Sequence, residues 1–93
     1  MIRTDSVLRL ASDVRFRAVP PETVLVRQSV PEVMVLSEVA GAIVERLDAK
    51  RPLHAVVDAL APLYDTDRAT LERDVLAFAE QLVASGVAEE TLP

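Results

Sequence analysis

The chain has 93 residues, 51% of them hydrophobic and 27% charged, a composition typical of one folded domain and not of a disordered segment. Its formal net charge of −5 disfavours binding to phosphate backbones and to anionic membrane surfaces. The absence of cysteine excludes disulfides, thiolate catalysis and zinc-finger chemistry. No apolar run approaches the ~20 residues that a membrane span needs, so we expect a soluble, cytoplasmic protein.

Three strands are predicted in the first half of the chain. Apolar and basic residues alternate over residues 14–18, which is the period of a half-buried strand. A second strand, rich in β-branched residues, follows at residues 23–27, and a third at residues 33–36. Their short links predict an antiparallel meander. Because both faces of the third strand are apolar, it is buried on both sides or holds one face open for a partner.

Three helices are predicted in the second half. The first follows Ser37, a suitable N-cap, and the second begins near Pro52 and is distorted at its end by Pro62. A capped turn precedes the third and longest helix, which ends at Gly86. The expected class is α+β, a meander followed by three helices. Residues 1–12 are interpreted as an N-terminal extension, 13–89 as the domain and 90–93 as a C-terminal tail.

No catalytic or metal-binding constellation is found, and we expect no cofactor. His54 is the only histidine, and no Cys, Ser or paired carboxylate stands at a telling distance from it. Glu72, Asp74 and Glu80 are spread around the third helix, where a solvated face explains them. With only two glycines, the chain lacks a phosphate-cradling loop. A binding module fits these features better than an enzyme.

The order of elements also suggests a winged helix-turn-helix, whose recognition helix would enter the DNA major groove. The third helix is a poor candidate for that role, because its outward face mixes acidic and basic residues such as Arg68, Glu72 and Arg73. A DNA-binding or transcriptional module is therefore kept as the alternative function. A weaker third option is a structural subunit that packs its apolar strand on a second copy, as a homodimer.

The chain resembles the PqqD-like family, the peptide recognition elements of ribosomally made, post-translationally modified peptide pathways, over residues 13–89. The resemblance rests on the order and spacing of short motifs: Leu36-Ser37, Ala40 and Ile43, Leu47-Asp48-Ala49, Leu60, Tyr64-Asp65, Asp74, and Leu82 followed by Gly86-Val87. Two positions depart from the family pattern. Ser37 stands where Asn is common, and Ala49 replaces a turn glycine, a position where a residue with a Cβ resists positive φ.

The resemblance implies that a disordered leader peptide adds as a strand to the edge of the third strand. Its apolar side chains would enter a cleft between that strand and the third helix. The chain would then deliver the precursor to a modifying enzyme, such as a radical S-adenosylmethionine enzyme or a leader peptidase. The implied peptide-binding residues are Glu32, Val33, Met34, Val35, Leu36 and Ser37 of the strand, with Leu71, Asp74, Val75, Phe78 and Leu82 of the helix.

Four helix residues in this set have a second interpretation. Val75, Phe78 and Leu82 are equally suited to be ordinary core, and Asp74 is as readily solvated as paired with a leader group. The sequence does not distinguish the pathway of the quinone cofactor PQQ from lasso peptide or sactipeptide pathways.

Overall fold

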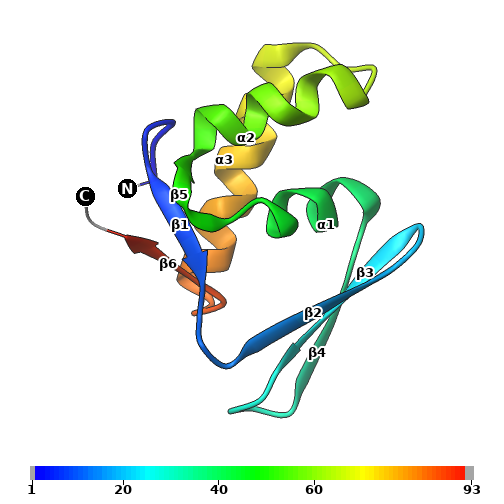
Figure 1. Cartoon of the computed structure of the whole chain (residues 1–93), viewed down its shortest axis with the longest axis vertical. Coiled ribbons are helices and arrows are strands. Elements are labelled where there is room, and N and C mark those ends of the chain that lie inside the picture. The colour runs from blue at the N-terminus through cyan, green and yellow to red at the C-terminus, as the bar shows by residue number, and fades with distance from the viewer. Residues whose placement is uncertain (1, 92–93) are drawn as a thin grey trace.

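The computed structural model describes residues 2–91 and shows an α+β chain with two antiparallel three-stranded sheets (Figure 1). The meander and the three helices agree with prediction, whereas the winged helix-turn-helix resemblance is not confirmed. The strands are β1 (Val7–Leu10), β2 (Val14–Val19), β3 (Glu22–Arg27), β4 (Glu32–Leu36), β5 (Asp48–Pro52) and β6 (Ala88–Thr91). The helices are α1 (Glu38–Glu45), α2 (Leu53–Leu60), the short 3₁₀ helix η1 (Ala61–Leu63) and α3 (Arg68–Ala84).

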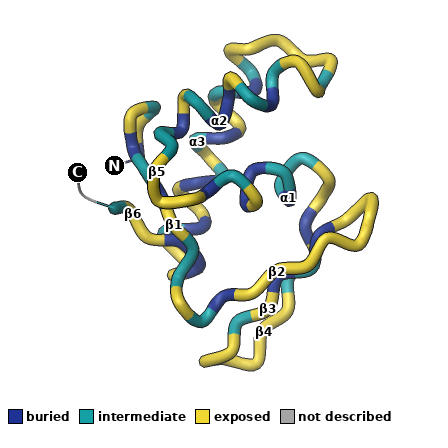
Figure 2. The backbone as a smooth tube through the Cα atoms, in the orientation of Figure 1, coloured by how far each residue is buried: buried dark blue, intermediate teal, exposed yellow. Residues whose placement is uncertain are grey.

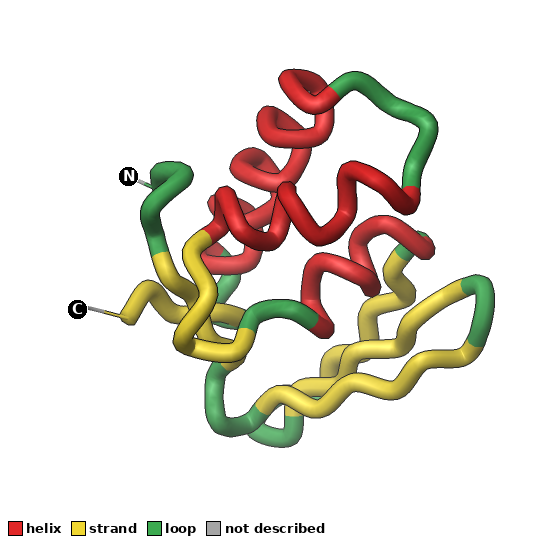
Figure 3. Tube along the Cα trace, turned by 45° about the horizontal axis from the view of Figure 1, so that its top comes forward, coloured by secondary structure: helices red, strands yellow, loops and turns green. Residues whose placement is uncertain are grey.

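The first sheet, here called the meander sheet, has the strand order β2-β3-β4. Its register pairs Leu25 of β3 with Phe16 of β2 and with Met34 of β4. Residues directly opposite one another share a face of a sheet, so these three define its inner face. Leu25 is fully buried, and α1 lies between this sheet and α2 (Figures 1 and 3). The meander sheet is therefore covered by helices on one face only.

The second sheet, here called the β1 sheet, has the strand order β5-β1-β6 and is absent from the sequence prediction. β1 lies within residues 1–12, interpreted above as an extension, and β6 begins before the predicted tail. Leu8 of β1 is fully buried, so this strand is part of the core. These strands have four or five residues each, and β5 and β6 are mostly polar, so neither shows an alternation long enough to detect. Residues 92–93 of the tail lie outside the described residues.

The main core lies where the β1 sheet meets α2 and α3 (Figure 2). Its fully buried side chains include Leu8, Leu53, Leu60, Val75 and Val87. They come from β1, α2, α3 and the turn after α3, so chain segments far apart in sequence form this core together. At ~25 cal/mol per Å² of buried apolar surface, such side chains each stabilise the fold by roughly 1.5–3 kcal/mol.

The helix ends follow the predicted chemistry. The Ser37 hydroxyl accepts the amide of Ala40 at 3.2 Å and caps α1. The side chain of Asp67 caps α3, and hydrogen bonds from the Thr70 hydroxyl and the Ala69 amide lower the pKa of this carboxyl. Gly86 ends α3 at φ 80°, and Val87 donates to the Leu82 carbonyl at 2.9 Å. The Gly86 amide also donates to the Val83 carbonyl at 3.1 Å, and the two bonds together form a Schellman motif.

Ala49, which departs from the turn glycine of the resembled family pattern, has a φ of 65°. A Cβ makes this conformation costly, so Ala49→Gly should relieve the strain, although the larger backbone entropy of glycine in the unfolded chain offsets part of the gain. The net effect should be a free energy of unfolding that is higher by about 0.5–1 kcal/mol. Urea denaturation measures the change. Ala77→Gly, at an exposed position inside α3, is the matched control and should lower the free energy of unfolding by about 1 kcal/mol. A loss of stability in Ala49→Gly would contradict this explanation.

Candidate functional site

β4 is an edge of the meander sheet. Among residues 2–91 it pairs only with β3, so its other side carries no strand. An edge strand presents unpaired N–H and C=O groups, to which another extended chain can bind. This agrees with the prediction that the third strand of the meander has an open edge.

The backbone groups at this edge are those of Val33 and Val35. The Gln28 amide donates to the Asp13 carbonyl at 2.8 Å, which directs the backbone of Gln28 toward β2. Backbone direction alternates along an antiparallel strand, so Leu25 is directed toward β4 and bonds with Met34, its partner in the register. Val33 and Val35 then point to the open side. Only alternate residues of the predicted segment 32–37 are therefore available to a bound chain.

The side chains of β4 divide between the two faces of the sheet. Met34 is half-buried and Leu36 buried, both on the inner face. Val33 and Val35 lie on the outer face and remain 64% and 60% exposed. The structure therefore does not bring these two valines together with Phe78 and the other predicted α3 side chains, because the period of a strand directs the valines away from the helices.

The α3 residues of the predicted site have different surroundings. Leu71, Val75 and Leu82 are 3% exposed or less and belong to the core, which agrees with the second interpretation of Val75 and Leu82. Phe78 is half-buried at the margin of that core, and Asp74 is exposed. Phe78 is therefore the predicted α3 side chain that combines apolar surface with access to solvent.

Arg27 of β3 connects the meander sheet to the end of α3. Its Nη1 donates to the Ser85 carbonyl at 2.9 Å, and its Nε lies 3.4 Å from Asp13 Oδ2 without hydrogen-bond geometry. The Ser29 hydroxyl donates to Asp13 and, together with the Arg27 charge, lowers the pKa of that carboxyl. Ser85 stands seven residues, close to two helical turns, after Phe78, so both lie on the flank of α3 nearest this contact.

A second contact joins α1 to the sheet. A Cβ placed on Gly41 would lie 2.2 Å from Thr23 Oγ1, so only glycine permits this approach of α1 to β3. The sequence shows a glycine in a helix but not its neighbour. This contact and Arg27 hold the sheet at its two ends.

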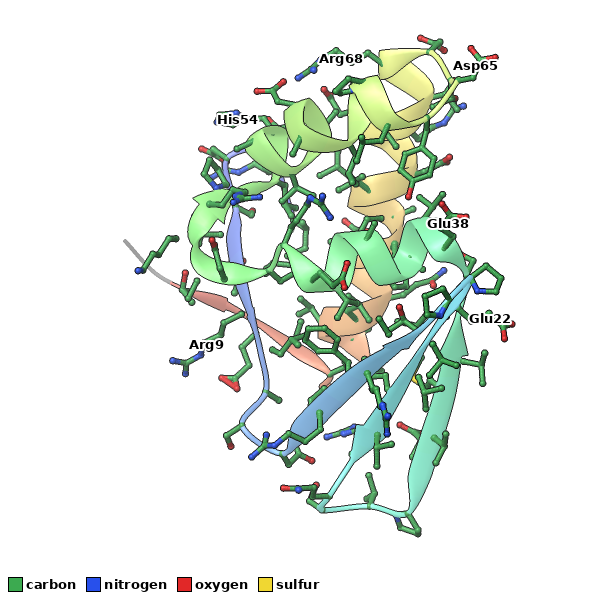
Figure 4. The ribbon with its side chains drawn as sticks, turned by 45° about the vertical axis from the view of Figure 1, so that its right-hand side comes forward. Arg9, Glu22, Glu38, His54, Asp65 and Arg68 are labelled. Carbon is green, nitrogen blue, oxygen red and sulfur yellow. The ribbon has the colours of Figure 1, made fainter. Side chains whose placement is uncertain are left out.

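A cavity of about 680 Å³ lies beside the β2–β3 turn, between Pro20, Pro21, Tyr64 and the carboxylates Glu22 and Glu38. Figure 4 shows Glu22 and Glu38 at this end of the sheet. None of the predicted site residues lines it. The signal for it in the sequence is the Pro20-Pro21 pair between two predicted strands.

His54 is exposed on α2 and apart from the other labelled residues (Figure 4). Within residues 2–91, no three His, Asp or Glu side chains are placed to hold a metal ion. No helix in the described part of the chain is long and apolar enough to cross a bilayer.

Comparison with known proteins identifies the family. Residues 22–88 match the family model described as coenzyme PQQ synthesis protein D. The chain belongs to the PqqD family. A PqqA binding protein of Rhodopseudomonas palustris (strain TIE-1) is 39% identical to this PqqD-family chain over 64 residues, which are 66% of the chain and 63% of the relative. The predicted resemblance is thus confirmed.

Two solved structures share the fold of this PqqD-family chain. TbiB1 in complex with the TbiA(beta) leader peptide superposes with a TM-score of 0.80 at 25% identity, covering 91% of this chain and 99% of TbiB1. The second is the PqqD truncation of Methylobacterium extorquens PqqCD, a stand-alone recognition element for ribosomally made, modified peptides. It superposes with a TM-score of 0.79 at 25% identity, covering 96% of this chain and 95% of the truncation.

The direction of the β4 backbone makes a prediction for hydrogen exchange. In the free protein, the amides of Val33 and Val35 should exchange much faster than those of Met34 and Leu36, which bond with β3. Amide exchange followed by nuclear magnetic resonance measures all four, with Leu25 of the central strand as a protected control. Equal protection of Val33 and Met34 would show that the edge is closed or the register different.

Proposed function

We propose that this chain is a non-catalytic peptide-binding module that takes the leader region of a ribosomally made precursor peptide as an added strand on β4. The open edge carries this proposal, because the backbone groups of Val33 and Val35 are directed outward and can bond to any extended chain. The leader complex of TbiB1 and the PqqA-binding name of the bacterial relative support it.

Specificity would come from side chains on the helix side of β4. Residues of the leader that point inward would lie beside Met34 and near Phe78, both half-buried. Leu71, Val75 and Leu82 would support this surface from within the core. Ser37 would contribute its backbone only, because its hydroxyl already caps α1. Glu32 and Asp74, both exposed, would lie near the ends of the bound segment.

The chain would deliver its peptide to a separate leader-dependent enzyme or peptidase and perform no chemistry itself. Its place would be the cytoplasm, where ribosomes make the precursor. PQQ and lasso peptide pathways both fit. A relative is named as a PqqA binding protein, and lasso peptide synthetase B1, solved in complex with its leader peptide, superposes on this chain with a TM-score of 0.76 at 28% identity. A second copy paired through β4 would occupy the same edge and compete with the peptide.

Calorimetric titration tests the proposal. The probes are PqqA of Rhodopseudomonas palustris and the TbiA(beta) leader, together with any precursor peptide encoded next to the gene for this chain. At least one should bind with a dissociation constant of about micromolar or lower and slow the exchange of the Val33 and Val35 amides. The control peptide carries proline at a central position, where the missing amide should weaken binding. Binding without added protection at these amides would contradict strand addition.

Phe78→Ala separates peptide contact from folding. Because Phe78 is only half-buried, truncation should lower the free energy of unfolding by about 1–3 kcal/mol, less than a fully buried Phe would lose. Affinity for the bound peptide should fall about tenfold or more. Leu76→Ala is the matched control, since Leu76 is also half-buried but two positions away around the helix. It should lose stability and keep wild-type affinity. A folded Phe78→Ala protein with unchanged affinity would remove Phe78 from the site.

A further inference from the structure

We propose that Val33 and Val35 form a second specificity-determining surface, which recognises aliphatic side chains of the bound peptide on the face of the sheet away from the helices. This inference rests on the proposed function. It means that the recognised segment is apolar at consecutive positions, whereas recognition by the helix side alone would require apolar residues only at every second position.

The outer face of the meander sheet presents a continuous apolar surface. Val33 pairs with Val26 and Val35 with Val24 in the register, so these four valines are neighbours on one face. Val33 and Val35 are the most exposed of them, and both border the open edge. Single exposed valines are common, but a contiguous apolar surface at a binding edge indicates contact with a partner.

Strand addition brings peptide side chains to this surface. In an antiparallel pair, residues that exchange backbone hydrogen bonds lie directly opposite and point to the same face. Peptide residues that bond with Val33 and Val35 would therefore direct their side chains to the outer face, ~4.5–5.5 Å in Cβ separation from these valines. The peptide residue between them would point inward, toward Met34. One backbone interaction thus sets which peptide positions meet the outer valines.

The charges on this face favour an aliphatic occupant. Arg15 and Arg17 are its basic residues, and they lie on β2, with β3 between them and β4. Beside the open edge, the outer face presents valine rather than charge. A β-branched or aliphatic peptide side chain would cover these valines, whereas a charged side chain would lose solvation there without gaining a partner.

Selection of displayed random peptides on the purified protein tests the preference without knowledge of the natural ligand. The wild-type protein should enrich peptides with a run of consecutive apolar residues. The double variant Val33→Thr/Val35→Thr keeps β-branched residues at the edge but makes them polar. It should enrich peptides that are apolar at every second position and accept any residue at the positions between. Val19→Thr is the matched control, because Val19 is 50% exposed but lies on β2, the opposite edge strand. It should select the wild-type pattern.

Calorimetry on one enriched peptide then measures the contact. Serine at its outward positions should weaken binding to the wild-type protein about threefold to tenfold and have little effect on binding to Val33→Thr/Val35→Thr. The serine peptides test the wild-type protein directly, so the result does not depend on how the double variant folds. If serine weakens binding to both proteins equally, or if the wild-type protein selects alternating patterns, the proposal of a second specificity surface is wrong while the proposed function stands. Failure to enrich any peptide would overturn the proposed function with it.

Discussion

The close approach of α1 to β3 is the constraint on which the arrangement of this molecule depends. Gly41 allows the helix to contact Thr23, where a Cβ would lie 2.2 Å from the hydroxyl oxygen. With the sheet held there and by Arg27 at the end of α3, its inner face is covered by helices. The covering stops at β4, whose outer edge stays open. The same contact that stabilises the sheet therefore leaves one strand able to bind.

An open edge is a risk as well as a site, because it also accepts chains that should not bind. β4 has only five residues, and a proline precedes it and a helix follows it, so the exposed backbone is short. Its two outward-directed residues, Val33 and Val35, carry β-branched side chains that favour an extended backbone before any peptide arrives. The edge is thus preorganised for a strand, which lowers the entropic cost of binding.

Local features were predictable from the residues alone. Hydrophobic periodicity located β2, β3, β4 and the three helices, and the caps at Ser37, Asp67 and Gly86 have the expected chemistry. The β1 sheet was not predictable, because its strands are short and β1 pairs with partners some 40 and 80 residues away along the chain. Their identity depends on Leu8 and Val87 entering a shared core, which no local pattern records.

The sequence by itself determined the class of the domain, the order of its main elements and the residues from which a peptide site could be built. Only the tertiary structure decided which of those residues lie at the open edge of the sheet and on which face. The pairing of β3 with β2 sets the backbone direction of Val33 and Val35, and the register with β3 places their side chains on the face opposite to Leu25 and Met34. Strand direction, face and edge are set by hydrogen bonds between segments distant in sequence, and a one-residue change of register would reverse all of them.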